Sequence, residues 1–165
     1  METTHIPAVV RQPAEVETLR TQQVTVRLLI DAHETGNSLS TVEVTMAAGA
    51  DGAAPHYHTR SEELFYVADG ELQVMAADEI VTVGAGGSIV VPRRMPHAFG
   101  AAPGSGARIL IALTPGVRRF EYFRMLERIA DGSATRAELA AVQDEFDNHF
   151  VDAPHWWAER NANRR

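Results

Sequence analysis

Residues 55–70 read PHYHTRSEELFYVADG, which places two histidines one residue apart, just ahead of a pair of glutamates and an apolar run. Side chains two residues apart in an extended segment point to the same side, so His56 and His58 are expected to share one face. The proline before them favours that extended conformation. A short loop would then bring Glu63 back toward the same interior. Neither charge balance nor core packing calls for this arrangement.

The dipeptide Asp69-Gly70 lies between two β-like runs and predicts a two-residue hairpin turn, because both central positions of such a turn favour positive φ. In that hairpin Glu63 and Phe65 fall on the more apolar face, whereas Glu62 falls on the opposite face. A carboxylate on an apolar inner face is costly unless a positive group meets it. The alternative is that Glu63 lies at the frayed end of the strand and reaches water.

A third imidazole comes from His97, far from the first two in the sequence. Three imidazoles and a carboxylate from two distant segments could converge only inside a barrel. Each residue taken alone is more often polar surface or a local hydrogen-bonding group, so the interpretation rests on the combination. The other histidines have no partner in the pattern and are assigned to the surface or to packing; they are His5, His33, His149 and His155.

Over about residues 40–113, this spacing resembles the cupin family. The first motif of that family is matched by His56, His58, Glu63 and Gly70, and most of the second by Gly86, Pro92 and His97. The resemblance implies a small antiparallel β-barrel of jelly-roll type, with a divalent metal bound by His56, His58, Glu63 and His97. Departures fall at turn positions: the opening glycine falls on Ala50, and a second-motif glycine is Arg94 here.

The remaining sequence fits an all-β fold with a helical extension. Between about residues 21 and 116, short apolar runs alternate with turn signals, which is typical of a β-sandwich or barrel. Apolar residues at every third position then predict a helix from Phe120, and a capping box at Thr135 predicts a second helix that runs through residues 137–146. We therefore expect an N-terminal arm at 1–20, the cupin barrel at 21–116 and a helical C-terminal extension at 117–165.

Composition narrows the classes of function. The chain has 165 residues, a net charge of −7 and no cysteine, and its only basic cluster is the terminal Arg164-Arg165. We expect no nucleic-acid or anionic-membrane partner without a basic surface, and a metal would need nitrogen and oxygen ligands. No secretory signal or membrane span is recognisable, so the expected location is the cytoplasm.

Three histidines and one glutamate suit Fe, Ni, Co, Mn, Cu or Zn. Four protein ligands on a six-coordinate metal leave two positions for substrate, water or dioxygen, whereas a tetrahedral zinc would be a closed structural site. Apolar residues expected on the same strand faces as the ligands predict an apolar substrate pocket. These residues are Phe65, Val74, Met95 and Phe99. The alternative is that they only fill the barrel, since every small barrel has an apolar interior. The arginines that could select an acidic group are Arg60, Arg93 and Arg94.

Among cupins, Thr114-Pro115-Gly116 followed by an aromatic helix start resembles the single-domain relatives of quercetin 2,3-dioxygenase. That resemblance implies a dioxygenase of a small enolic or phenolic substrate, with Glu63 as the catalytic group that takes the substrate proton. The alternatives are a non-oxidative metal-dependent cupin, such as an isomerase, lyase or cyclase, and a non-catalytic cupin that binds a small ligand. A homodimer is expected, with the strand at 24–30 as a candidate for exchange between subunits.

Overall fold

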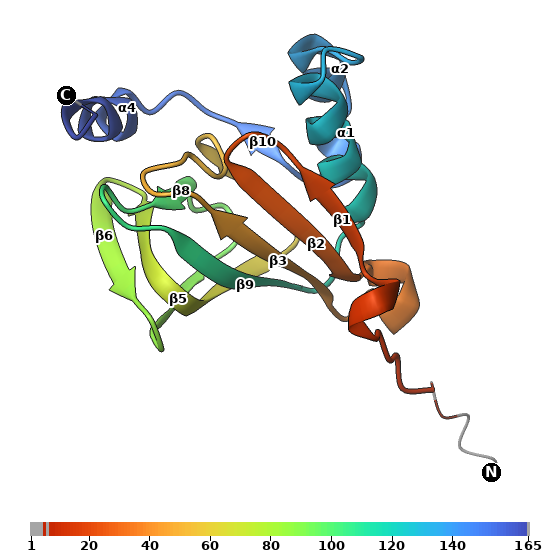
Figure 1. Ribbon diagram of the computed structural model, residues 1–165. Coiled ribbons are helices and arrows are strands. Elements are labelled where there is room, and N and C mark those ends of the chain that lie inside the picture. Colours follow the sequence, from red (N-terminus) through yellow and green to blue (C-terminus); the bar gives the residue numbers. More distant parts are fainter. Residues whose placement is uncertain (1–4, 6, 165) are drawn as a thin grey trace.

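The computed structural model describes residue 5 and residues 7–164 (Figure 1). Its strands are β1 (Glu17–Arg20), β2 (Val24–Ile30), β3 (Ser40–Met46), β4 (His56–Tyr57), β5 (Glu62–Ala76), β6 (Glu79–Gly84), β7 (Ser88–Val91), β8 (His97–Ala101), β9 (Ala107–Thr114) and β10 (His149–Phe150). Its helices are α1 (Phe120–Ala130), α2 (Arg136–Ala141), α3 (Gln143–Phe146) and α4 (Pro154–Ala162), and short 3-10 turns lie at Pro13–Glu15 and Ala32–Thr35.

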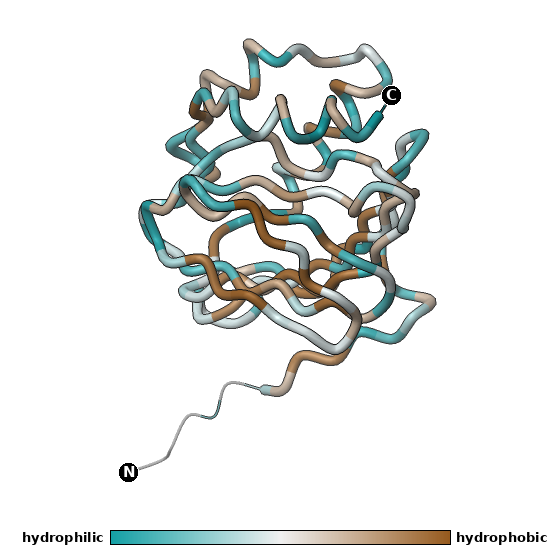
Figure 2. Tube along the Cα trace, turned by 90° about the vertical axis from the view of Figure 1, so that its left-hand side faces the viewer, coloured by the Kyte–Doolittle hydropathy of each residue, from teal (hydrophilic) through white to brown (hydrophobic). Residues whose placement is uncertain are grey.

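The paired strands are antiparallel and follow the order β1-β2-β3-β9-β5-β8-β4-β10, with β6 and β7 also paired to β5. Hydrophobic stretches run along these strands (Figure 2). Their inward side chains, among them Leu28, Val44, Phe65 and Ile109, form one buried core. The predicted antiparallel barrel with C-terminal helices is therefore confirmed.

The predicted hairpin at Asp69-Gly70 is wrong, because β5 continues through both residues. Between Val67 and Asp69 its pairing with β9 shifts in register, as at a β-bulge. Gly70 has φ +73° and lies so close to Gly106 that a Cβ would overlap the Gly106 carbonyl oxygen. Glycine at positive φ occurs in bulges as well as in turns. Here the chain pairs with β9 on both sides of Asp69-Gly70, so a bulge forms and not a hairpin turn.

The inner face of β5 nevertheless carries the residues expected on it. The register shift changes the parity of the strand, so odd-numbered residues point inward before it and even-numbered residues after it. These inward side chains are buried, with exposed fractions of 2% or less; they are Glu63, Phe65, Val67, Leu72 and Val74. Glu63 therefore lies inside the barrel and does not reach water at a frayed strand end.

At the N-terminal side, the structure differs from the expected arm at residues 1–20. Residues 17–20 form β1, which pairs with β2 and buries Leu19. β2 is paired on its other side with β3, so both edges of the strand at 24–30 are occupied within the chain. The homodimer stays a prediction, and residues 1–4 and 6 of the expected arm lie outside the described residues.

In the C-terminal extension, α1 begins at Phe120 as predicted, and Thr135 caps α2 through a capping box with Glu138. The expected second helix is interrupted at Val142, where α2 ends and α3 begins. Figure 1 shows α1 and α2 beside β1, α4 across the molecule from them, and β10 between. No helix among the described residues is long and apolar enough to cross a membrane.

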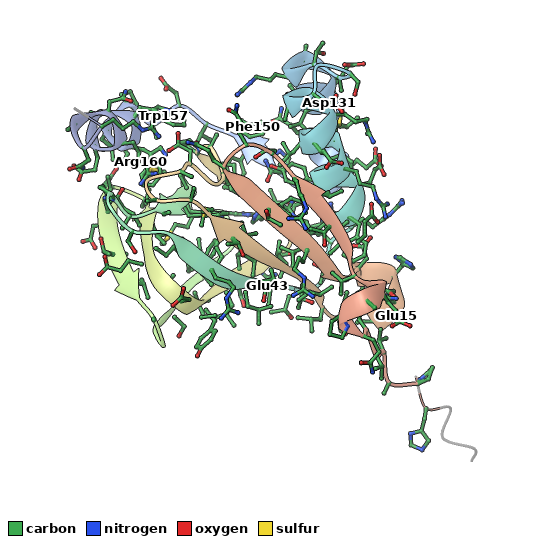
Figure 3. All side chains as sticks on the ribbon, in the orientation of Figure 1. Glu15, Glu43, Asp131, Phe150, Trp157 and Arg160 are labelled. Carbon is green, nitrogen blue, oxygen red and sulfur yellow. The ribbon has the colours of Figure 1, made fainter. Side chains whose placement is uncertain are left out.

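The last helix is fixed to the barrel by Arg160 and Trp156. The Trp156 side chain is fully buried against Met75 and Ala98. The Arg160 guanidinium, also buried, donates five hydrogen bonds; the acceptors are Asp51, Gln73 and the carbonyls of Gly49, Ala50 and Ala101. These contacts hold α4 against the outer face of β5 and β8, and Figure 3 shows Arg160 directed from α4 toward the barrel.

The position where Arg94 replaces a motif glycine makes a testable prediction about stability. Arg94 has φ +67°, a conformation that is strained for residues with a Cβ, and its N–H donates to the His58 carbonyl at 2.6 Å. We expect Arg94→Gly to raise the free energy of unfolding by about 0.5–1 kcal/mol, measured by chemical denaturation. The control Arg93→Gly, at an exposed position with no positive φ, should lower it. An equal loss of stability in both variants would contradict the assignment of strain.

Candidate metal centre

Four buried side chains converge inside the barrel: His56, His58, Glu63 and His97. One ligand atom from each residue lies within 4.8 Å of the others, and each residue is at most 2% exposed. The structure therefore brings together all four residues that the sequence predicted as metal ligands. The remaining histidines lie elsewhere: His5, His33 and His155 are exposed, and His149 stacks on Tyr57.

Strand pairing places these ligands. On the short strand β4, His56 is the direct partner of His97 on β8, and their ring centroids are 4.3 Å apart. His58 follows two residues later in the chain and points the same way. Glu63 lies near the start of β5, where this strand pairs with β7 and β9 and not with the strands that carry the histidines. Its Oε2 lies 3.0 Å from Nε2 of His58 and 2.7 Å from Nε2 of His97.

Backbone carbonyls orient all three imidazole rings. Each Nδ1 lies within hydrogen-bonding distance of a carbonyl oxygen: Ala54 for His56 (2.7 Å), Met95 for His97 (2.9 Å) and Asp147 for His58 (2.5 Å). A carbonyl can only accept, so Nδ1 donates, and a neutral ring then has its lone pair at Nε2. This tautomer, fixed by an outer hydrogen bond, is the one that metal-binding histidines commonly adopt.

Electrostatics keep His56 neutral and Glu63 ionised, the forms in which these two groups bind a metal. Burial lowers the pKa of His56 well below its usual value, and the nearby His97 and His58 lower it further. For Glu63, burial raises the pKa, but the adjacent His58 and His97 outweigh it and hold the pKa well below the ordinary value. A neutral imidazole and an ionised carboxylate are the binding forms of these groups. The donor set thus fits a divalent transition metal, and the sequence contains no thiolate to compete.

Asp147, which the sequence reasoning missed, holds one ligand in place from the C-terminal extension. Its carbonyl accepts from His58, while its carboxylate accepts from the Thr59 N–H (2.9 Å), the Thr59 hydroxyl (2.6 Å) and the Arg60 N–H (2.8 Å). Burial raises the pKa of Asp147, but these hydrogen bonds outweigh burial and lower it overall. Asp147 has φ +50° and follows α3 directly. No local sequence signal marks this residue, because its partners lie almost ninety positions away.

A cavity of about 790 Å³ opens onto His56 and Glu63. Its walls come from β1 to β3, α1, α2 and the segment 150–157, and most of the lining side chains are apolar, such as Leu19, Val44 and Leu126. Figure 3 shows Phe150 on β10 and Trp157 on α4, two residues that line this cavity.

The predicted pocket residues take different positions. Phe99 lines the cavity, but Phe65, Val74 and Met95 are not among its lining residues. Phe65 and Val74 are fully buried in the core, and Met95 packs against that core. The arginines considered for an acidic group do not line the cavity and are exposed; they are Arg60, Arg93 and Arg94. Three other arginines line it instead: Arg20, Arg119 and Arg136. Of these, Arg119 is buried.

Comparison with known protein families agrees with the barrel fold described above. Residues 42–113 match the family described as the cupin domain. The middle part of the barrel is therefore similar to a cupin domain. No curated protein matches the chain in sequence.

Solved structures with the same fold include three proteins at low identity. KdgF from Halomonas sp. is 21% identical, with a TM-score of 0.54 over 63% of this chain and 92% of KdgF. Pac13 from Streptomyces, described as a nucleoside dehydratase, is 18% identical, with a TM-score of 0.52 over 66% of this chain and 83% of Pac13. Hydroxypropylphosphonic acid epoxidase from S. wedmorenis is 25% identical, with a TM-score of 0.55 over 65% of this chain and 59% of the epoxidase. These structures support the fold, and each of their activities belongs to that protein.

The role of Asp147 can be tested without assaying activity. We expect Asp147→Asn to weaken metal binding by up to roughly tenfold. The backbone carbonyl that accepts from His58 remains, but the side chain loses its charge and one of the two oxygens that accept from Thr59 and Arg60, so the segment that positions this carbonyl is held less firmly. The comparison is a competition titration against a chelator, with Asp144→Asn as the control, since Asp144 lies in the same segment but is fully exposed. Unchanged metal affinity in Asp147→Asn would show that His58 does not depend on this segment.

The lowered pKa of Asp147 also predicts a pH dependence of stability. A carboxyl group with a depressed folded pKa stabilises the fold above its unfolded pKa, and that contribution is lost as the pH falls through the folded pKa. The metal-free wild type should therefore exceed Asp147→Asn in melting temperature at neutral pH, and the two should converge on acidification below about pH 4. A constant difference across that range would contradict the ionised, hydrogen-bonded carboxylate.

Proposed function

We propose that this protein is a metal-dependent dioxygenase that acts on a small enolic or phenolic molecule. The observation that carries the proposal is a buried cluster of three histidines and one glutamate in contact with a mostly apolar cavity of about 790 Å³. A cavity of that volume suits a small organic molecule, and its apolar lining favours a hydrophobic or planar one. A bound divalent metal would supply Lewis acidity and open coordination positions for substrate and dioxygen.

Within this centre, Glu63 is suited to take the substrate proton. It is the single carboxylate of the cluster, it faces the cavity, and its lowered pKa keeps it ionised. His56 also faces the cavity, but its Nδ1 is engaged with the Ala54 carbonyl. An enol or phenol that enters beside Glu63 can therefore transfer its hydroxyl proton to this carboxylate. The apolar walls exclude water from the deprotonated oxygen, which strengthens its attraction to a metal.

Oxidative chemistry is supported by one structural neighbour, since hydroxypropylphosphonic acid epoxidase carries such a reaction in its name. The same ligand set also suits a non-oxidative isomerase, lyase or cyclase. The two functions differ in one observable property, the requirement for oxygen.

The test is oxygen uptake by metal-reconstituted protein with a panel of flavonols and other enolic aromatics, repeated under anaerobic conditions. We expect substrate-dependent oxygen consumption in the wild type. Glu63→Gln should lower the rate at least about 100-fold, because it removes the proton acceptor, while elemental analysis still finds part of the metal. The control His97→Ala should lose both metal and activity.

Full oxygen consumption by Glu63→Gln would overturn the role of Glu63. Turnover that continues without oxygen would replace the dioxygenase with a non-oxidative enzyme. Metal binding without any turnover would leave a cupin that binds a small ligand without catalysis.

A further inference from the structure

Arg119, just before α1, is a buried arginine whose charge is not neutralised within the described part of the chain. The residue is 4% exposed. Its backbone N–H donates to Asp31. Its guanidinium makes one long hydrogen bond, from Nη1 to the Phe146 carbonyl at 3.4 Å, and a further polar contact with the Tyr122 side chain, but it has no carboxylate partner among the described residues. Its Nε has no hydrogen-bond partner among the described residues. A buried cation without a carboxylate partner is costly, so its presence needs a reason.

Arg160 shows how this fold treats a structural buried arginine. It is buried to a similar extent, yet it pairs with Asp51 at 3.0 Å and donates to four further acceptors. Arg119 has no comparable set of partners. The difference indicates that the partner of Arg119 is not part of the described chain.

The Arg119 side chain lies in the wall of the cavity that reaches His56 and Glu63. Its guanidinium carbon is 4.2 Å from the ring centroid of Tyr122 and 5.5 Å from that of Phe123, and both rings line the same cavity. Stacking on two aromatic rings fixes the guanidinium and leaves its N–H groups at the edge free for a ligand.

Tyr122 links this position to the metal centre electrostatically. Burial raises the pKa of Tyr122, the neighbouring Arg119 lowers it, and the Glu63 carboxylate raises it. The phenol is therefore within electrostatic reach of both charges. A ligand in this cavity can contact Arg119 with one group while another group lies beside Glu63.

A second buried polar group lacks a partner close by. The Asn148 amide is 1% exposed, and neither its oxygen nor its nitrogen has a hydrogen-bond partner among the described residues. Asn148 lies two residues after Phe146, whose carbonyl accepts from Arg119.

We propose that Arg119 binds an acidic group of the substrate, so that the ligand of this cavity is an organic acid, with a carboxylate joined through an apolar body to the enol or phenol. The guanidinium fork matches a carboxylate with two parallel hydrogen bonds. The part of this inference that concerns the enol or phenol rests on the proposed function. The part that concerns Arg119 does not, because it predicts binding and needs no turnover.

The experiment is calorimetric titration of the metal-reconstituted protein with phenolic acids of increasing length and with their primary amides. The probes are para-hydroxybenzoate, para-hydroxyphenylacetate and para-coumarate. The best acid should bind the wild type roughly 10- to 100-fold more tightly than its amide, as expected for a charge-assisted hydrogen bond to a carboxylate. Arg119→Met should remove this preference while binding the amide as the wild type does.

A matched control is Arg136→Met, which removes an exposed arginine from the rim of the same cavity. It should keep the preference for the acid. The melting temperature of ligand-free Arg119→Met should equal or exceed that of the wild type, because the variant removes an unpaired buried charge but keeps a side chain of similar length.

Three results would overturn the proposal. The first is that no acid binds the wild type more tightly than its amide, which includes the case in which neither binds detectably. The second is that Arg119→Met keeps the preference for the acid, and the third is that Arg119→Met has a lower melting temperature and weakens the binding of acid and amide equally. A preference for acids that depends on Arg119, without oxygen uptake, would refute the proposed dioxygenase and leave the acid-binding site intact.

Discussion

The placement of the Glu63 carboxylate among three imidazoles inside a hydrophobic barrel is the constraint on which the rest of the structure depends. Removing a carboxylate and three imidazole rings from water costs desolvation free energy, so each of their polar atoms needs a partner inside the protein. The Nε2 atoms of His58 and His97 face Glu63, and backbone carbonyls hold each Nδ1. The apolar core around Phe65 and Val74 fixes the strands that carry these groups. A bound divalent cation would compensate the negative charge of the buried Glu63 carboxylate more fully than the neighbouring imidazoles do.

The C-terminal extension is part of this centre as well as an addition to the barrel. β10 pairs with β4, the strand that carries His56, and Asp147 orients His58. α1 and α2 close one side of the cavity, and α4 is fixed on the other side by Arg160 (Figure 1). Residues 42–113, which match the cupin domain, supply the ligands, whereas the residues outside this range supply much of the cavity wall. The shape of the cavity is therefore set largely by segments beyond the matched region.

Local sequence could predict the parts of the structure that depend on local spacing. The motif residues His56, His58, Glu63 and His97 converge as expected, and α1 and the Thr135 cap appear where periodicity and capping predict them. The Gly70 turn was wrong because positive φ is shared by hairpins and bulges, and only pairing with β9 distinguishes them. Asp147 and Arg119 could not be found, because their roles come from contacts with residues far away in the sequence.

The most direct test of this account is X-ray absorption at the metal edge, after elemental analysis of protein reconstituted with Fe, Co, Ni or Mn. The account predicts about one metal per chain, with scattering from three imidazoles and further oxygen donors, and loss of imidazole scattering in His97→Ala. A folded protein that binds no metal after reconstitution would contradict it. So would a bound metal whose spectrum shows no imidazole ligands.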